Sequence, residues 1–298
     1  MDAIVTTHSE YLPLQSVFIR PLDQAFREAA KVEAQWKDLN YLSRPDYVKA
    51  VDQYSKFESL IRSGASEVYP MEGETDLSLD SLYCRDASVM TDFGIILCNM
   101  GKEARKGEPS LHRSVYQTLG IPILGEIEAP GTLEGGDLAW IDSQTLAVGH
   151  SYRSNMEGIE QLKALLSPRG IEVIVADLPH FRGPSDVFHL MSILSPVDKD
   201  LAVVYSPLMP IGFRQELLDR GFSFIEVPRA EFDSLGSNVL ALGPRECVMV
   251  QGNPITETAL REAGCAVHTY SGAEVSIKGG GGPTCLTRPY LRKKQPKA

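Results

Sequence analysis

The amino-acid sequence predicts an α/β protein built from five repeated units that close into a ring. Three observations support this prediction. Five stretches carry apolar residues at helical spacing, each is followed by a short strand-like run, and four are preceded by two apolar runs around a turn. The repeat length of roughly 45 to 55 residues is typical of propellers and repeat arrays.

The five helical stretches each end at a glycine, which is a frequent helix stop signal. They span residues 45–64, 109–120, 155–170, 212–221 and 255–264. The strand-like runs that follow them span residues 66–70, 121–130, 171–179, 222–229 and 265–271. Each pair therefore predicts a helix followed by a β-strand.

Two apolar runs around a turn precede the second to fifth helices and predict a β-hairpin in each unit. These hairpins span residues 88–100, 137–151, 192–208 and 238–253. The first helix follows a single run, residues 16–21, and the C-terminal run at residues 285–291 is expected to pair with it. That pairing would close the ring, because radial closure protects sheet edges. An ordinary mixed α/β sheet with the same elements in another order is the alternative.

Composition and charge limit the classes of function. The net charge of −10 argues against a nucleic-acid surface and is compatible with cationic small molecules. The N-terminus lacks the pattern of a signal peptide, and no apolar run approaches the roughly 18 residues of a membrane span. The five cysteines include no CxxC pair, so a reducing cytoplasm is expected, without a disulfide framework or a zinc site.

The composition does not shift along the chain, so one domain is expected over residues 1–298. Its basic end, about residues 291–298, is expected to be a disordered tail. Residues 29–46 are expected to form a loop or lid near a pocket.

Cys285 is the first candidate for chemistry, because it follows four glycines and a proline in KGGGGPTC. A lone cysteine is more often a small buried hydrophobe, but glycines permit unusual backbone angles and the close approach of a substrate. A cysteine nucleophile needs a proton donor and an acid that orients it. His189, in DVFHLMSILS at the start of the fourth unit's first strand, is the candidate donor.

Carboxylates stand at corresponding places in other units. Glu134 and Asp137 flank two glycines before the third unit's first strand, and Asp80 and Asp86 flank an apolar-aromatic run before the second unit's. In a cyclic array these positions converge with those of the cysteine and the histidine. Acids around a thiol suit a guanidinium, which is planar, always charged and matched to carboxylates.

Two arginines complete the substrate hypothesis. Arg105 in GKEARKGEP and Arg153 in GHSYRSN each follow the hairpin of their unit, where they could clamp a substrate carboxylate. Exposed arginines usually only solvate a surface. With the acids and the thiol, however, they indicate an amino acid that has a guanidino tail.

The sequence resembles the guanidino-group-modifying enzymes of the pentein fold, and most closely the dimethylarginine dimethylaminohydrolases. The resemblance covers nearly the whole chain through the segments LDSLYCRD, ARKGEP, EAPGTLEGGD, VGHSYRSN, FHL and GGGGPTC, in that order. It implies a pentein fold, in which five ββαβ-type units form a pseudo-fivefold α/β propeller around a central active-site channel.

The resemblance also implies roles for the candidate residues. Cys285 would be the nucleophile, His189 the general acid and base, and Glu134 the group that orients the histidine. Asp86 would hold the guanidinium with Asp80 assisting, Arg105 and Arg153 would bind the α-carboxylate, and Asp137 would be structural. No cofactor and no metal are expected, because the thiolate is the nucleophile and carboxylates handle the charge.

The implied reaction is hydrolysis at the guanidinium carbon through a cysteine-linked thiouronium intermediate. Dimethylarginine would give citrulline and dimethylamine. Met191, where deiminases usually carry a second acid, and the lack of a long helical insertion favour dimethylarginine, whereas Arg85 in YCRD is deiminase-like. Arginine deiminase, arginine dihydrolase, amidinotransferase and a non-catalytic member of the family are the alternatives. The expected partner is a small guanidino amino acid, with no nucleic acid and no membrane, and a homodimer is left open.

Overall fold

The computed structural model describes residues 5–73 and 76–294, and their strands form five small sheets. One sheet has the strand order β1 (Val5–Thr6), β16 (Thr287–Lys293), β2 (Leu14–Ile19) and β3 (Glu67–Pro70). The other four sheets have three strands each: β4 (Ser88–Thr91), β5 (Gly94–Leu97) and β6 (Ile123–Glu126); β7 (Leu138–Trp140), β8 (Thr145–His150) and β9 (Glu172–Asp177); β10 (Leu194–Asp198), β11 (Leu201–Val204) and β12 (Ser223–Glu226); β13 (Leu240–Gly243), β14 (Glu246–Val250) and β15 (Ala266–Tyr270).

Every sheet repeats one pattern of pairing. An antiparallel pair of strands is extended by a third strand that runs parallel to the second. A helix joins the second strand to the third, as parallel neighbours require. These helices are α3 (Tyr47–Gly64), α4 (Glu108–Thr118), α5 (Met156–Leu166), α6 (Ile211–Asp219) and α8 (Pro254–Glu262).

The five helix–strand pairs and the four hairpins predicted from the sequence are therefore confirmed. The pairing of the first and last runs is confirmed as well, because β16 runs antiparallel to β2. Three short helices were not predicted: α1 (Leu22–Ala25), α2 (Ala29–Gln35) and α7 (Arg229–Phe232). The result is a mixed α/β fold of several small sheets.

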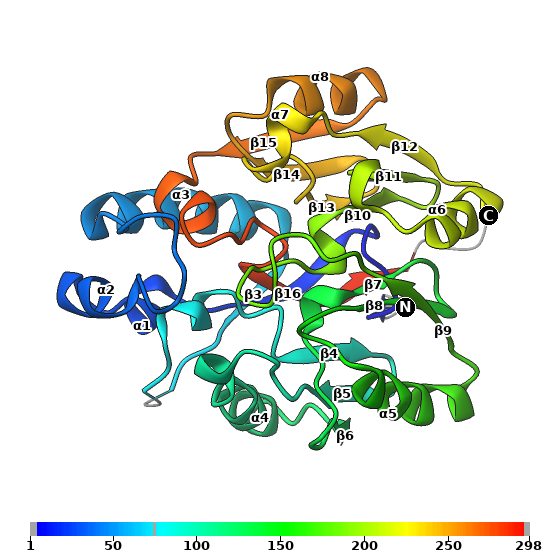
Figure 1. Ribbon diagram of the computed structural model, residues 1–298, viewed down its shortest axis with the longest axis horizontal. Helices are drawn as coiled ribbons and strands as arrows, with labels where there is room; N and C mark the ends of the chain where they lie inside the picture. Colours follow the sequence, from blue (N-terminus) through cyan, green and yellow to red (C-terminus); the bar gives the residue numbers. More distant parts are fainter. Residues whose placement is uncertain (1–4, 74–75, 295–298) are drawn as a thin grey trace.

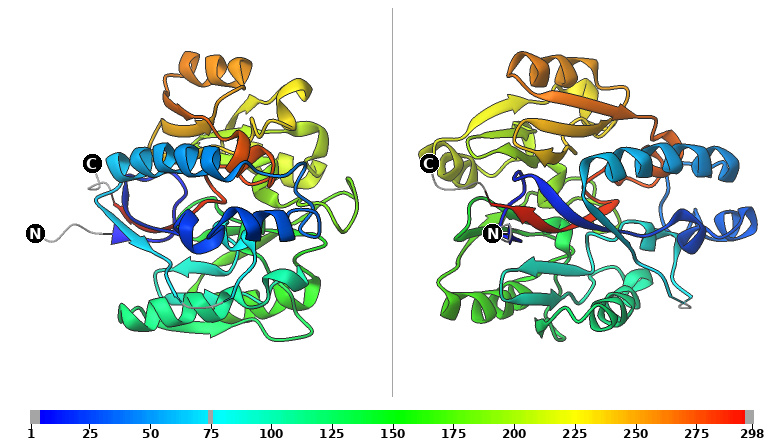
Figure 2. Two further views of the ribbon diagram at one scale, coloured as in Figure 1. Left: turned by 90° about the vertical axis from the view of Figure 1, so that its left-hand side faces the viewer. Right: turned by 180° about the vertical axis from the view of Figure 1, so that it is seen from behind.

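The helices lie on the outside of the molecule and the strands lie inside (Figure 1). The β4–β6 sheet and α4 are at the bottom of this view, the β13–β15 sheet and α8 are at the top, and β16 lies between them. The same arrangement is seen from two other sides in Figure 2. Apolar side chains of the strands pack against the helices in four buried clusters. Two of these clusters join neighbouring units, since one contains residues of α6 and α8 and another contains residues of β2 and β14.

A buried polar cluster lies among these apolar ones. It contains Glu10 and the guanidinium groups of Arg85, Arg288 and Arg292, all at most 5% exposed. Arg85 Nη2 donates to Glu10 Oε1 at 2.9 Å. Burial alone would raise the pKa of Glu10, but the three guanidinium charges outweigh burial and lower it. The side chain of Arg85 is thus directed into the core.

The prediction of a tail from residue 291 onward is wrong for its first three residues. Residues 291–293 belong to β16, where Arg292 faces Thr6 of β1 and Lys293 faces Val5. These pairs satisfy backbone groups that a tail would leave to water. Residues 295–298 lie outside the described residues.

The stretch predicted to be a loop or lid begins instead with α2, because Val32 is buried against the apolar cluster that includes Phe26. Only its later part is free of helix, and Leu39, Asn40 and Leu42 of that part line a pocket. Within residues 5–73 and 76–294, no helix has both the length and the apolar character that crossing a membrane demands.

Candidate active site

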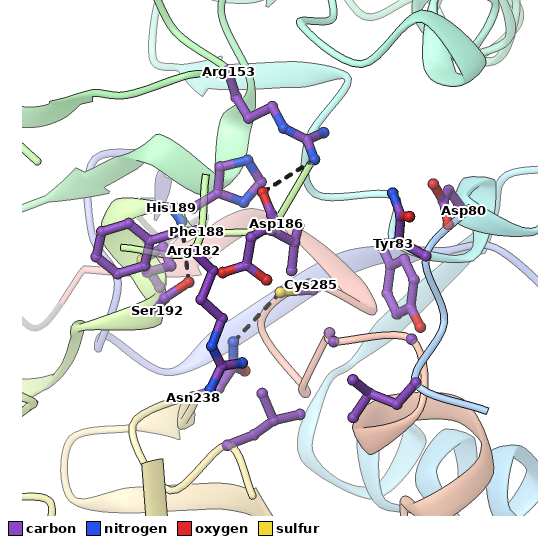
Figure 3. A pocket seen from close by; sticks show the side chains of 18 of the residues that line it. Asp80, Tyr83, Arg153, Arg182, Asp186, Phe188, His189, Ser192, Asn238 and Cys285 are labelled. Atoms are coloured by element: carbon purple, nitrogen blue, oxygen red, sulfur yellow. Dashed lines mark hydrogen bonds between the residues drawn. The ribbon is translucent and has the colours of Figure 1, made fainter. Parts of the chain in front are cut away.

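The candidate residues come from short segments that precede the first strand of a sheet. Asp86 precedes β4, Glu134 precedes β7, His189 precedes β10 and Cys285 precedes β16. Of the predicted site residues, six line one pocket: Asp80, Asp86, Arg105, Arg153, His189 and Cys285. Figure 3 shows Asp186 and Asn238 beside the Cys285 sulfur, whereas Asp80 lies beyond the ring of Tyr83. Glu134 is fully buried behind the pocket wall.

His189 and Glu134 form a buried pair. Nε2 of the imidazole lies 2.9 Å from Glu134 Oε2, and both side chains are at most 5% exposed. The backbone also fixes the histidine, because His189 caps a 3-10 turn and its N–H donates to Ser192 Oγ at 3.1 Å. The imidazole passes close over Gly136, where an added Cβ would lie 2.5 Å from Nδ1. Only glycine permits that approach.

The electrostatics of this pair keep the imidazole charged. Burial alone would lower the pKa of His189, but the carboxylates of Asp137, Asp86 and Glu134 outweigh burial and raise it to about 9. Burial alone would raise the pKa of Glu134, whereas the hydrogen bond and charge of His189, with two arginines, lower it to about 2. At neutral pH the pair is therefore an imidazolium and a carboxylate.

Asp137 supports the turn beneath this pair. Its carboxylate accepts hydrogen bonds from the hydroxyls of Ser151 and Ser154 and from the N–H of Leu190. Burial raises its pKa to about 6, although the charge of His189 and the three hydrogen bonds act against that rise. Asp137 is fully buried and does not line the pocket, so it braces the segment that carries His189.

Cys285 is held from one side by Asn238. The Asn238 amide N–H donates to Cys285 Sγ at 3.4 Å, and its carbonyl oxygen accepts from the N–H and the hydroxyl of Thr284. Burial and the nearby Asp86 charge raise the pKa of the Cys285 thiol, while the hydrogen bonds from Thr284 and Asn238 act against that rise. In the structure the thiol is therefore favoured over the thiolate.

The glycine run before Cys285 is required by packing against the protein itself. An added Cβ at Gly279 would lie 1.8 Å from the Tyr83 hydroxyl oxygen, and one at Gly281 would lie 2.4 Å from the Tyr83 ring. Tyr83 in turn donates from its hydroxyl to the carbonyl oxygen of Val275 at 2.8 Å. The glycines thus let the loop that carries the cysteine close over a buried tyrosine.

Asp86 has one engaged oxygen and one free oxygen. Its Oδ2 accepts from Arg105 Nη1, and Oδ1 is buried without a hydrogen-bond partner among the described residues. Arg105 is bound on its other side by both oxygens of Glu108, each at 2.8 Å, and it also donates to the Tyr83 carbonyl oxygen. Four of its five N–H groups are therefore used within the protein.

Arg153 is less engaged than Arg105. Its Nη2 donates weakly to the Asp186 carbonyl oxygen at 3.4 Å, and its Nη1 lies 3.6 Å from Glu134 Oε1. Nη1 is buried and has no hydrogen-bond partner among residues 5–73 and 76–294. An anionic group that entered the pocket would find a donor there (Figure 3).

Asp80 carries a cation of the protein itself. Lys102 Nζ donates to Asp80 Oδ2 at 2.6 Å and to the Leu39 carbonyl oxygen at 2.9 Å. The Lys102 side chain is 18% exposed and lines the pocket with Asp80. Sequence reasoning missed this partner, because a whole hairpin separates Lys102 from Asp80 along the chain.

One group in the described part of the chain has the composition of a metal site. Ligand atoms of Asp86, Glu134 and His189 lie within 4.8 Å of one another. Both carboxylates of this group already have partners within the protein: Glu134 forms a hydrogen bond with His189, and Asp86 accepts one from Arg105. A metal would have to displace both pairs, so the donor set fits a proton-transfer site better than a metal centre.

Asn238 was missed by sequence reasoning, although a usable signal was present. It lies two residues before β13, just as Asp86 lies two residues before β4 and Cys285 two residues before β16. In the other units, the segment before the first strand was searched for acids, a histidine and a cysteine. In this unit the same segment carries an amide.

Comparisons with known proteins identify the family. A model of the arginine deiminase family matches residues 74–218 and 212–292, which is most of the chain, so the chain belongs to that family and to the guanidino-group-modifying pentein superfamily. An uncharacterized protein of Bacillus subtilis, YkgA, is 25% identical over 95% of this chain and 94% of its own length. The dimethylarginine dimethylaminohydrolase of Pseudomonas aeruginosa is 26% identical over 83% of this chain and 91% of its own.

Solved structures agree on the fold. The Pseudomonas aeruginosa dimethylaminohydrolase in complex with citrulline has a TM-score of 0.74 at 23% identity and covers 93% of this chain and all of its own. The N-terminal domain of the cyanobacterial arginine dihydrolase ArgZ has a TM-score of 0.78 at 19% identity, over 91% of this chain and 96% of that domain. The amidinotransferase SxtG of Microseira wollei has a TM-score of 0.77 at 14% identity, with 99% of both chains covered.

Proposed function

We propose that the protein is a C–N hydrolase that acts on the guanidinium carbon of arginine or N-methylated arginine, with dimethylarginine as the leading substrate. The observation that carries the proposal is the free, buried Oδ1 of Asp86 in the same pocket as Cys285 and the charged His189. A buried carboxylate oxygen without a partner is costly, and a guanidinium is the group that best satisfies it.

The reaction begins when the cationic guanidinium binds beside Asp86. Its charge offsets the Asp86 charge that opposes ionisation of Cys285, so the thiol releases its proton to solvent and the thiolate attacks the guanidinium carbon. The imidazolium of His189 protonates the departing amine, and a thiouronium on Cys285 remains. The neutral imidazole then removes a proton from water as hydroxide adds to the same carbon. The tetrahedral intermediate expels the Cys285 thiolate and loses its hydroxyl proton to solvent, which gives the neutral ureido product.

We propose that two arginines of the pocket, Arg153 and Arg105, bind the carboxylate of the substrate. Arg153 holds the carboxylate through its free Nη1, and Arg105 holds Asp86 in place while keeping one N–H group for the same carboxylate. Met191 lines the pocket where a second acid would bind the guanidinium, which leaves apolar space for N-methyl groups. Arg85 does not favour either arginine or dimethylarginine as substrate, because its side chain lies in the core and outside the pocket lining.

We also infer that the five sheets are blades of a pseudo-fivefold α/β propeller around the active site. The support is that the segment before the first strand of each sheet supplies one group to a single site: Asp86, Glu134, His189, Asn238 and Cys285. A cyclic array brings equivalent positions together in this way.

The direct test is product identification. The protein is incubated separately with arginine, monomethylarginine and dimethylarginine, and citrulline, ornithine, ammonia and alkylamines are measured. We expect citrulline and dimethylamine; citrulline with ammonia would indicate a deiminase, and ornithine a dihydrolase. Guanidinoacetate formed from arginine and glycine would indicate amidino transfer.

Variants locate the chemistry. Cys285→Ser is expected to abolish turnover, whereas Cys265→Ser, which alters a buried cysteine outside the pocket, is expected to retain it. Near-normal turnover by Cys285→Ser would contradict the mechanism. If no guanidine is converted by the wild-type protein, the function is wrong while the fold stands.

A further inference from the structure

The second acid of the pocket, Asp80, is already neutralised by a lysine of the protein. The Lys102 ammonium is 2.6 Å from Asp80 Oδ2 and 2.9 Å from the Leu39 carbonyl oxygen. A lysine has three N–H donors, so one N–H group of Lys102 is left for a ligand. The contact is largely sheltered, because the two side chains are 18% and 6% exposed.

The backbone of Lys102 is anchored as well. Its N–H donates to Glu134 Oε1 at 3.0 Å, so the residue is tied to the buried pair of His189 and Glu134. The lysine therefore does not depend on its side-chain contacts alone to stay at the pocket.

The position of Asp80 matters for what a substrate must carry. In the view of Figure 3, the ring of Tyr83 lies between the Cys285 sulfur and Asp80, so Asp80 stands apart from the point of attack. An ammonium group on the substrate is the ligand that a free Asp80 would attract. With Lys102 in place, an arriving ammonium meets a neutral ion pair and a like charge at the same carboxylate.

Two fully buried atoms of the pocket lack a hydrogen-bond partner among the described residues, and they call for opposite charges. Asp86 Oδ1 is free for a guanidinium, and Arg153 Nη1 is free for a carboxylate. The lining as a whole is not acidic, since six cationic side chains and four carboxylates contribute to it: Lys102, Arg105, Arg153, Arg182, His189, Lys278, Asp80, Asp86, Asp186 and Asp233. Neither free group would be left unpaired by a ligand that lacks an ammonium.

We propose that Lys102 removes the requirement for an α-ammonium group, so that the site also hydrolyses ω-guanidino carboxylates that lack the α-amino group. The inference rests on the proposed function and extends its substrate class. Lys102 acts as a specificity residue: its ammonium takes the role at Asp80 that an amino-acid substrate would otherwise fill.

The test compares matched substrate pairs. Arginine is paired with 5-guanidinopentanoate, and dimethylarginine with its counterpart that lacks the α-amino group. Within each pair the guanidine and the carboxylate are the same, so the ratio of kcat/KM reports the α-ammonium alone. For the wild-type protein we expect the des-amino member to react at least as well as the amino acid; a preference of more than tenfold for the amino acid overturns the proposal.

Variants assign the effect to the lysine. Lys102→Met frees Asp80 and is expected to shift the ratio by about 10- to 100-fold toward the amino acid, the range for a hydrogen bond to a charged group. Lys278→Met is the matched control, because the Lys278 ammonium also bonds one carboxylate and one backbone carbonyl, at 2.6 Å and 3.0 Å. It is expected to leave the ratio unchanged.

Asp80→Asn added to Lys102→Met is expected to cancel the shift, since the freed carboxylate is then gone. An unchanged ratio in Lys102→Met, or a shift that survives Asp80→Asn, overturns the proposal. If Lys102→Met does not fold, Lys102→Gln replaces it and the wild-type ratio still decides.

Binding to Cys285→Ser separates this inference from the proposed function. Calorimetric titration of that variant with both members of each pair measures the α-ammonium preference without turnover. Equal or tighter binding of the des-amino acid supports the inference even where no product forms. Tighter binding of the amino acid by more than tenfold, or no binding of either member, overturns it.

Discussion

The Glu134→Gln substitution tests the charged state of the buried pair. It keeps the shape of the side chain and removes the negative charge that faces His189 Nε2 at 2.9 Å. It also removes the carboxylate charge beside Arg153, whose Nη1 lies 3.6 Å from Glu134 Oε1 in the wild-type protein. The imidazolium then loses one of the three carboxylates that raise its pKa.

The structure gives the size and the pH window of the effect. The pKa of His189 rises from 6.5 to about 9, which at about 1.4 kcal/mol per tenfold corresponds to about 3 kcal/mol of stability. Because this pKa is raised, the stabilisation is complete below pH 6.5 and is lost as the pH rises through about 9. The pKa of Glu134 falls from 4.5 to about 2, so its share is present above pH 4.5 and is lost as the pH falls through about 2. Both shifts include the same Glu134–His189 interaction and are not added.

Urea unfolding at pH 6 and at pH 10 measures this dependence. Glu134→Gln removes one of the three carboxylates behind this shift, so it is expected to lower the free energy of unfolding by about 1.5–3 kcal/mol at pH 6, the range for a hydrogen bond to a charged group. The loss is expected to be clearly smaller at pH 10, where His189 is neutral. Glu172→Gln is the control, because Glu172 is 57% exposed and pairs with Arg220 at the surface, where such pairs contribute at most about 1 kcal/mol. An equal loss at both pH values would refute the assignment of an imidazolium–carboxylate pair.

Two further substitutions test the positioning of the site. Asn238→Ala removes the amide that donates to Cys285 Sγ, so alkylation of the thiol by iodoacetamide near neutral pH should slow by about tenfold; an unchanged rate would show that the amide does not stabilise the thiolate. Gly136→Ala places a Cβ 2.5 Å from His189 Nδ1 and is expected to lower the free energy of unfolding by about 1–3 kcal/mol. Gly212→Ala, in α6 where an added Cβ meets nothing within 4 Å, should instead raise it by up to about 1 kcal/mol; equal effects of the two would contradict the packing argument.

The repeated units were predictable because their signals are local. Helical spacing that ends at a glycine placed α3, α4, α5, α6 and α8, and alternating turn chemistry placed the hairpins between them. The pairing of β2 with β16 was also predictable, since a single apolar run precedes the first helix, with no neighbouring run to form a hairpin. The missing hairpin strand of the first unit could be recognised only because the other four units each have one.

The partners of the charged side chains were not predictable. Asp80 and Lys102 lie in different parts of one unit, and nothing in their spacing indicates that an ammonium closes on that carboxylate. Arg105 was expected to face a substrate, yet four of its N–H groups serve Asp86, Glu108 and a carbonyl oxygen. Such pairings depend on how the folded segments approach one another, which the sequence of one chain does not encode locally.

The glycine run shows the same division between what is local and what is not. Its permissive backbone was visible in the sequence, and the expected reason was the close approach of a substrate. The structure supplies another reason, since Gly279 and Gly281 pack against Tyr83, whose own ring is fixed by the Val275 carbonyl. The loop therefore acts on the cysteine through the protein: it is closed by a buried aromatic side chain, and Asn238 then reaches Cys285 Sγ from the neighbouring sheet. A substitution at Gly279 would thus disturb the thiol through the clash with Tyr83.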